Sequence, residues 1–126
     1  MESSISINKH IFSILTSDKS LKEMVGTKIF PIVADDDVKF PYIILERTSI
    51  TPYTYKGGVG YDKATFQIKI ADSDYINTIN IAEKVRELLE LRTSTSNYFK
   101  RIEFSNCNED FLNDTYRQTL QFIAII

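Results

Sequence analysis

The chain has 126 residues, of which 43% are hydrophobic and 25% are charged, and its net charge at pH 7 is −2. These values fit a single globular domain over residues 1–126 and exclude disordered and fibrous classes. The fifteen basic residues never occur three together, so no basic face for specific nucleic-acid binding is expected.

Membrane and secretory features are not expected either. The single cysteine, Cys107, cannot form an internal disulfide or a zinc cluster, which suits a reducing compartment. The opening stretch MESSISINKH lacks the basic start and the apolar core of a signal peptide. No apolar run approaches the roughly 20 residues of a membrane helix. We therefore expect a soluble, unsecreted protein without a membrane partner.

The first predicted elements are helical. An apolar stripe predicts a helix over about residues 4–16, with Ser3 or Ser4 as its cap. The stripe consists of Ile7, Ile11, Ile14 and Leu15. A short second helix follows, and Gly26 supplies the positive φ that commonly ends a helix.

Three strands are predicted next. KIFPIVA (28–34) and PYIILERTSI (41–50) are rich in β-branched and aromatic residues, and Pro31 places the first of them at a sheet edge or at a strand start. ATFQIKI (64–70) alternates apolar and polar side chains. This alternation predicts a half-buried strand in an antiparallel sheet with one face in solvent.

A long amphipathic helix is predicted over about residues 74–91, with Asp72 or Ser73 as its cap. Its apolar stripe consists of Ile81, Ala82, Val85, Leu88 and Leu89.

The last two predicted strands are YFKRIEFSNC (98–107) and YRQTLQFIAII (116–126), joined by a turn in NEDFLND (108–114). From Gln118 to Ile126 the chain carries no charged side chain. An uncovered strand edge of this kind is prone to aggregation. We expect this strand either to lie centrally in the sheet or to help build a subunit interface.

Helices and strands segregate along the chain rather than alternating. This order predicts an α+β fold, with an antiparallel sheet of about five strands. The N-terminal helix and the long helix are expected to pack on one face of that sheet.

Candidate catalytic and metal sites are few. His10 is expected on a helix surface, and a dyad with Cys107 would require the two side chains to meet. We expect the acidic stretches 35–37 and 109–114 to be solvated turns, and a cation site is the less favoured alternative for each. We predict no catalytic residue, no metal and no cofactor. A further hypothesis, a small hydrolase that uses two carboxylate side chains for catalysis, requires a pocket that holds two acidic residues.

The stretch TPYTYKGGVGYDK (51–63) carries three of the seven tyrosines and three of the four glycines. It is longer than the two to five residues that a hairpin needs. Tyrosine offers contact area with few rotors to freeze, and glycine allows close backbone approach. The predicted loop either lies back on its own sheet or reaches a neighbouring chain. In the second case the interface residues are Pro52, Tyr53, Tyr55, Lys56, Gly57, Gly58 and Tyr61.

Four segments resemble the tail-completion or tail-terminator proteins of long-tailed phages. They are LKEMVGTKIFP (21–31), FPYIIL (40–45), FQIKIADSDYINTINIAEKVRELLE (66–90) and the closing YRQTLQFIAII. The resemblance covers nearly the whole chain as a diffuse pattern, and the DDD stretch and the long Tyr-Gly loop depart from it.

The resemblance implies a small α+β domain with a structural, non-catalytic role. Subunits would close into a ring, usually six-fold, that caps the tail tube at its head-proximal end and joins it to the head connector. The implied partners are other copies of this chain, a tail-tube protein and a head-connector protein. The implied location is the virion tail, with assembly in the host cytoplasm. The alternative is a small binding module, an adaptor or inhibitor, that uses the 51–62 hairpin for recognition.

Overall fold

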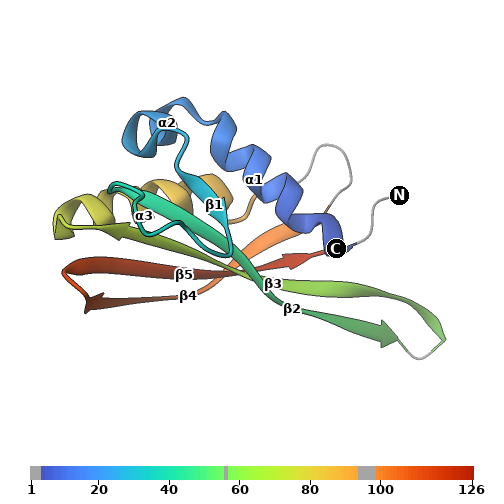
Figure 1. Ribbon diagram of the computed structural model, residues 1–126. Helices are drawn as coiled ribbons and strands as arrows, with labels where there is room; N and C mark the ends of the chain where they lie inside the picture. The colour runs from blue at the N-terminus through green and yellow to red at the C-terminus, as the bar shows by residue number, and fades with distance from the viewer. Residues whose placement is uncertain (1–3, 56, 94–98) are drawn as a thin grey trace.

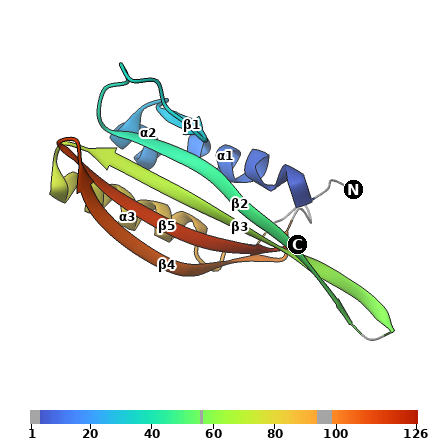
Figure 2. The ribbon, with the colours of Figure 1, turned by 60° about the horizontal axis from the view of Figure 1, so that its bottom comes forward.

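The computed structural model describes residues 4–55, 57–93 and 99–126. One five-stranded sheet, in the order β1-β2-β3-β5-β4, carries the helices on one face (Figures 1 and 2). The predicted α+β fold is confirmed. Its elements are the 3-10 helix η1 (Ser4–Ser6), α1 (Ile7–Ser17), α2 (Lys19–Val25), β1 (Ile29–Pro31), β2 (Tyr42–Tyr55), β3 (Gly58–Asp72), α3 (Tyr75–Leu89), β4 (Arg101–Leu112) and β5 (Thr115–Ile125).

The sheet is antiparallel except at one edge. β2, β3, β5 and β4 pair antiparallel in turn, as expected. β1 instead pairs parallel with β2, with Ile29 opposite Ile43. The chain returns through residues 32–41 to the end of the sheet where β1 began, so β2 runs in the same direction as β1. Pro31 ends this short edge strand, where its missing N–H is tolerated.

The alternation predicted in β3 is confirmed. Phe66, Ile68 and Ile70 are fully buried beneath the helices. On the helix-free face, Gln67 donates to Gln121 (Nε2–Oε1 3.4 Å) and Lys69 lies 3.6 Å from Glu46. The helices therefore cover one apolar face of the sheet and leave a polar face uncovered. The core comprises residues from α1, α2, α3 and all five strands, including Ile11, Leu15, Leu21, Ile29, Ile43, Phe66, Ile81, Val85, Ile102 and Phe122.

The uncharged C-terminal segment forms an interior strand. Ala124 of β5 lies between Ala64 of β3 and Ile102 of β4. Both edges of β5 are thus hydrogen-bonded within the chain. The expected central placement is confirmed, and β4 forms the far edge of the sheet.

The turn predicted over residues 108–114 was wrong because β4 continues through most of it. β4 runs on to Leu112, through most of the acidic NEDFLND stretch, and only Asn113 and Asp114 turn the chain. Both residues have positive φ, 52° and 58°, as a tight two-residue hairpin turn requires. Polar side chains on an exposed edge strand stay in contact with water, so they add little unfavourable free energy to the strand. The polar residues 108–110 therefore did not mark the end of β4.

The predicted caps of the long helix were also wrong. Asp74 is the cap, and its carboxylate accepts from the backbone N–H of Asn77 at 3.3 Å. Asp72 is buried at the end of β3, where it accepts from the Asn77 side chain at 2.6 Å and from the Ser73 N–H at 2.7 Å.

α1 begins after the one-turn η1, and its N-cap, Ser6, makes no side-chain cap bond. Of the two predicted caps, Ser4 lies in η1 and donates to Asp62 instead, whereas Ser3 lies outside the described residues. None of the helices in the described part of the chain combines the length and apolar character that crossing a bilayer requires.

We expect Phe66→Ala to lower the free energy of unfolding by about 3–5 kcal/mol, because it leaves a cavity in a fully buried site against Phe122, whose ring centroid lies 5.5 Å away. Urea unfolding followed by circular dichroism measures this loss. The matched control is Gln67→Ala on the opposite face of the same strand, which should cost no more than about 1 kcal/mol. Equal costs for the two variants would contradict the one-sided core.

Candidate assembly surface

The most distinctive surface of the molecule is a two-stranded ribbon that extends past the sheet (Figures 1 and 2). We call residues 51–61 the arm. β3 pairs with β5 only from Lys63 onward, and the last backbone bonds on that side join Asp62 and Ile126 (N–O 3.1 and 2.9 Å). β2 pairs with β1 only as far as Leu45. Within the described residues, no third strand flanks the arm.

The predicted long loop is therefore wrong, because its residues form a β-hairpin. Tyr53 pairs with Tyr61, and Tyr55 pairs with Gly58 across a register shift. Gly57, at φ 83°, lies in the tight turn. Cross-strand pairs of tyrosine and β-branched residues stabilise such a ladder even without a core beneath it.

The arm presents aromatic rings beside lysines. The Tyr53 and Tyr61 rings stack with centroids 5.5 Å apart and planes at 12°. Lys63 Nζ lies 4.9 Å from the Tyr53 centroid, and Lys100 Nζ lies 5.9 Å from that of Tyr61. Cation–π attraction holds these ammonium groups near the stack. Tyr53 remains 43% exposed, so the stack offers a cationic, aromatic surface to solvent.

This surface lies on the helix-free side of the sheet. Side chains alternate along a strand, so Tyr61 and Lys63 share a face of β3 with Gln67. The arm thus continues the uncovered polar face and adds aromatic area to it.

The structure places the described members of the predicted interface set together on the arm. Pro52 is exposed and lies opposite Asp62, and Gly58 opens β3. Lys56 lies outside the described residues. The remaining members are Tyr53, Tyr55, Gly57 and Tyr61.

Gly60 is a further arm residue that the sequence prediction did not single out. A Cβ at this position would lie 1.6 Å from the carbonyl oxygen of Tyr53. Only glycine therefore permits the two strands to approach here. The sequence signal that could have identified Gly60 is its position as a glycine within a stretch that forms a strand, which often marks a close backbone approach.

The base of the arm is tied to the first helical turn. The Ser4 hydroxyl donates to the Asp62 carboxylate at 2.5 Å, and Arg47 Nη1 donates to the Ile5 carbonyl at 2.7 Å. These bonds hold η1 against the point where the arm leaves the sheet, so the arm has a defined root.

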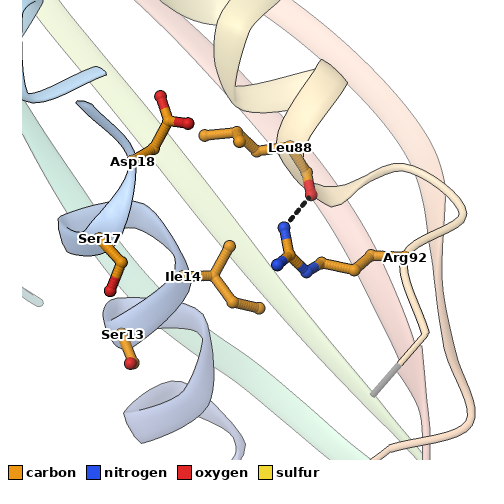
Figure 3. A pocket seen from close by; sticks show the side chains of 6 residues that line it. All are labelled: Ser13, Ile14, Ser17, Asp18, Leu88 and Arg92. Atoms are coloured by element: carbon orange, nitrogen blue, oxygen red, sulfur yellow. Dashed lines mark hydrogen bonds between the residues drawn. The ribbon is translucent and has the colours of Figure 1, made fainter. Parts of the chain in front are cut away.

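A hollow of about 270 Å³ lies between α1 and the end of α3 (Figure 3). Its charged groups are engaged in local structure. Arg92 donates to the Leu88 carbonyl at 3.2 Å, and Asp18 caps α2 by accepting from the Leu21 N–H at 2.9 Å. The lining residues are Ser13, Ile14, Ser17, Asp18, Leu88 and Arg92.

A second hollow, of about 430 Å³, lies between α1 and the β1–β2 edge. It is lined by Asn8, Lys9, Phe12, Pro31 and Leu45. Neither hollow brings two carboxylates together, which is the arrangement that the hydrolase reading requires.

The acidic stretches do not gather into a metal site. Asp110 pairs with Arg117 through two hydrogen bonds of 2.6 and 2.5 Å, which lower the pKa of its carboxyl. Glu109 accepts from the Tyr75 hydroxyl (3.0 Å) and the Gln118 amide (2.9 Å). Among the described residues, no group of three or more potential ligands is placed to hold a metal ion.

Cys107 is not set up as a nucleophile. Burial raises the pKa of its thiol, and the negative charge of Glu109 raises it further. The thiol therefore remains protonated at neutral pH, whereas the reactive species is the thiolate. Its sulfur lies 3.9 Å from the Gln118 side-chain oxygen and 4.0 Å from the Asn108 carbonyl oxygen. The other member of the candidate dyad, His10, lies on α1.

Comparison with known proteins gives a family match over almost the whole chain. A profile of the family described as "Tail completion protein gp17" matches residues 9–126. No curated protein sequence matches this one. A chain in the solved structure entitled "Virion of native gene transfer agent (GTA) particle" has a similar fold, with a TM-score of 0.78. It is 18% identical, and the alignment covers 91% of this chain and 90% of that one.

We expect Gly60→Ala to break the pairing of Tyr53 with Tyr61, because the added Cβ meets the Tyr53 carbonyl. Amide hydrogen exchange over residues 51–61 should become at least about tenfold faster, while exchange in the core of β3 is unchanged. Thr51→Ala, also on the arm, is the control and should keep slow exchange. Unaltered exchange in Gly60→Ala would contradict the close approach.

The thiol of Cys107 should be alkylated by iodoacetamide with an apparent pKa above its ordinary value. Glu109→Gln should lower this pKa, because it removes a negative charge that disfavours the thiolate. The pH dependence of the alkylation rate measures both values. Glu46→Gln, which alters a carboxylate on the helix-free face, should have no effect. If the Cys107 pKa stays the same or rises in Glu109→Gln, the negative charge of Glu109 does not raise the pKa of this thiol.

Proposed function

Because this chain belongs to the family of tail completion proteins that the gp17 profile describes, over residues 9–126, we propose that it forms a ring capping a phage or prophage tail tube. The ring stops growth of the tube and joins it to the head connector. Proteins of this family are structural components of phage tails. We propose no catalytic step for it.

The arm is the observation that carries this proposal. It leaves the sheet and exposes stacked aromatic rings flanked by lysines, and none of the helices that the structure describes lies over it. An isolated two-stranded ribbon is only marginally stable in water, so a contact with a partner would stabilise it. Tyrosine is also among the residues most enriched at the energetic centre of interfaces.

A ring follows if the arm of each copy reaches the next copy in the same sense. Such a contact is heterologous, because two different surfaces meet, and it closes when the rotation between copies divides a full turn. We propose six copies, the number that the family resemblance implies. A contact of standard size hides about 800 Å² on each partner.

The other partners in this proposal are a tail-tube protein on one side of the ring and a head-connector protein on the other. The proposed location is the head-proximal end of the tail, after assembly in the host cytoplasm. The similar chain from the gene transfer agent virion supports a place within a virion, since its title names that particle.

The arm can be removed without altering the core. We expect replacement of residues 53–61 by Asn-Gly, which removes the Tyr53–Tyr61 stack, to leave the protein folded but to weaken ring formation at least tenfold, since a tyrosine at the energetic centre of an interface contributes about 2 kcal/mol. Asn-Gly suits this position because it closes a two-residue hairpin between paired residues, here Pro52 and Asp62. Native mass spectrometry measures the ring, and joining of heads to tails measures the function.

An unchanged far-UV spectrum and unfolding temperature serve as the control for folding. A shortened protein that still forms rings and still joins heads to tails would show that the arm is not the assembly element. A wild-type protein that stays monomeric, both alone and on tail tubes, would favour the adaptor reading.

A further inference from the structure

The end of the sheet opposite the arm carries an exposed apolar surface. Tyr75, Ile76, Phe111 and Leu112 are each between 38% and 61% exposed. Tyr116 links the two aromatic members, since its ring centroid lies 5.4 Å from that of Tyr75 and 4.7 Å from that of Phe111, and Ile76 and Leu112 are the next residues in the chain. We call Tyr75, Ile76, Phe111 and Leu112 the end patch. Contiguous exposed apolar surface of this kind marks sites of protein contact.

The end patch and the arm lie at opposite ends of the same sheet. β3 pairs Asp72 with Tyr116 at one end and Lys63 with Ile125 at the other. Figures 1 and 2 both show the β4–β5 turn and the start of α3 at the end away from the arm. In a head-to-tail array these are the two ends that meet.

The charges at the two ends are opposite. Acidic residues adjoin the end patch along the chain: Asp74 precedes Tyr75, Glu109 and Asp110 precede Phe111, and Asp114 lies two residues after Leu112. Of these, Asp110 is already bound to Arg117. The stack on the arm is flanked by Lys63 and Lys100. Opposite charges on two surfaces steer them together and disfavour contacts between like ends.

The end patch is also held in place by polar bonds that run from the surface at Tyr75 to the buried Thr78. The Tyr75 hydroxyl donates to both Glu109 oxygens at 3.0 Å, and the Gln118 amide donates to Glu109 at 2.9 Å. Gln118 also reaches the buried Thr78 hydroxyl at 3.4 Å. This network joins α3, β4 and β5, so the patch is preorganised and little ordering is needed when a partner binds.

The hollow between α1 and the β1–β2 edge is the other apolar surface that an arm could occupy. Its charged lining residue is Lys9, and Arg47 lies nearby, bound to Ile5. These cations have the same sign as the lysines of the arm. Charge therefore favours the end patch over this hollow.

We propose that the arm of one copy docks on the end patch of the next, with the Tyr53–Tyr61 stack against Phe111 and Leu112 and the arm lysines facing the acidic residues that adjoin the end patch. This inference rests on the proposed ring and names its second surface. The contact is heterologous, so each copy uses both of its ends once.

Photo-crosslinking tests the contact directly. Tyr53 is replaced by p-benzoylphenylalanine, and crosslinked pairs are mapped by mass spectrometry in the purified protein and in assembled tails. Crosslinks to residues 74–76 or 109–116 of a second copy are expected. Crosslinks between copies that map instead to residues 8–12 or 31–33 would overturn this inference and leave the ring intact. Rings that native mass spectrometry detects but that give no crosslink from Tyr53 between copies would also overturn this inference, whereas the absence of rings, both alone and on tail tubes, would overturn the proposed function.

A pair of exposed leucines supplies the matched variants. Leu112→Lys adds a positive charge to the end patch at a side chain that is 54% exposed, whereas Leu91→Lys makes the same change at one that is 74% exposed beyond α3. Ring formation should fall at least roughly tenfold in Leu112→Lys, because the new charge repels the arm lysines and replaces an apolar contact, and stay unchanged in Leu91→Lys. Both variants should keep the wild-type unfolding temperature. Wild-type rings in Leu112→Lys would overturn the inference.

Discussion

The position of β5 between β3 and β4 determines the rest of the architecture. Its uncharged segment needs hydrogen-bond partners on both edges and apolar cover on one face, and the fold supplies all three. With β5 in the interior, β3 has its other edge free for β2, and the helices close over Phe66 and Phe122. β3 has 15 residues and β5 has 11, so β3 runs past its neighbour at the end where β5 stops. The arm is what remains of β2 and β3 beyond that point.

An arm of this kind must hold its shape without a core. Cross-strand stacking of Tyr53 on Tyr61, lysines over both rings and the tight fit of Gly60 against the Tyr53 carbonyl together keep the two strands paired. In the part of the chain that the structure describes, no helix lies over these side chains, so they remain available to a partner. In the proposed assembly, one set of residues would therefore supply both the local stability of the arm and its contact with the next copy.

Much of the fold was predictable from the sequence, because the relevant signals are local. Alternation over residues 64–70 identified the buried face of β3, and the lack of charge after Gln118 identified the interior strand. The family was also recognisable, although only as a diffuse pattern. The ends of strands were not predictable, since polar residues from 51 to 55 and from 108 to 112 pair across strands with no buried face to mark them. The parallel pairing of β1 depends on the path of residues 32–41, which carries no periodic signal. The end patch was missed for a similar reason, because Tyr75 and Phe111 lie far apart in sequence and meet only through Tyr116.

Both ends of the described chain converge on the root of the arm. Ser4 is bonded to Asp62 from one side, and Ile126 exchanges backbone bonds with the same residue from the other. A purification tag or fluorescent protein fused next to either position would crowd the element that we assign to self-association. The acidic loop at residues 35–37, which is exposed and belongs to neither the arm nor the end patch, is the better insertion point for a label.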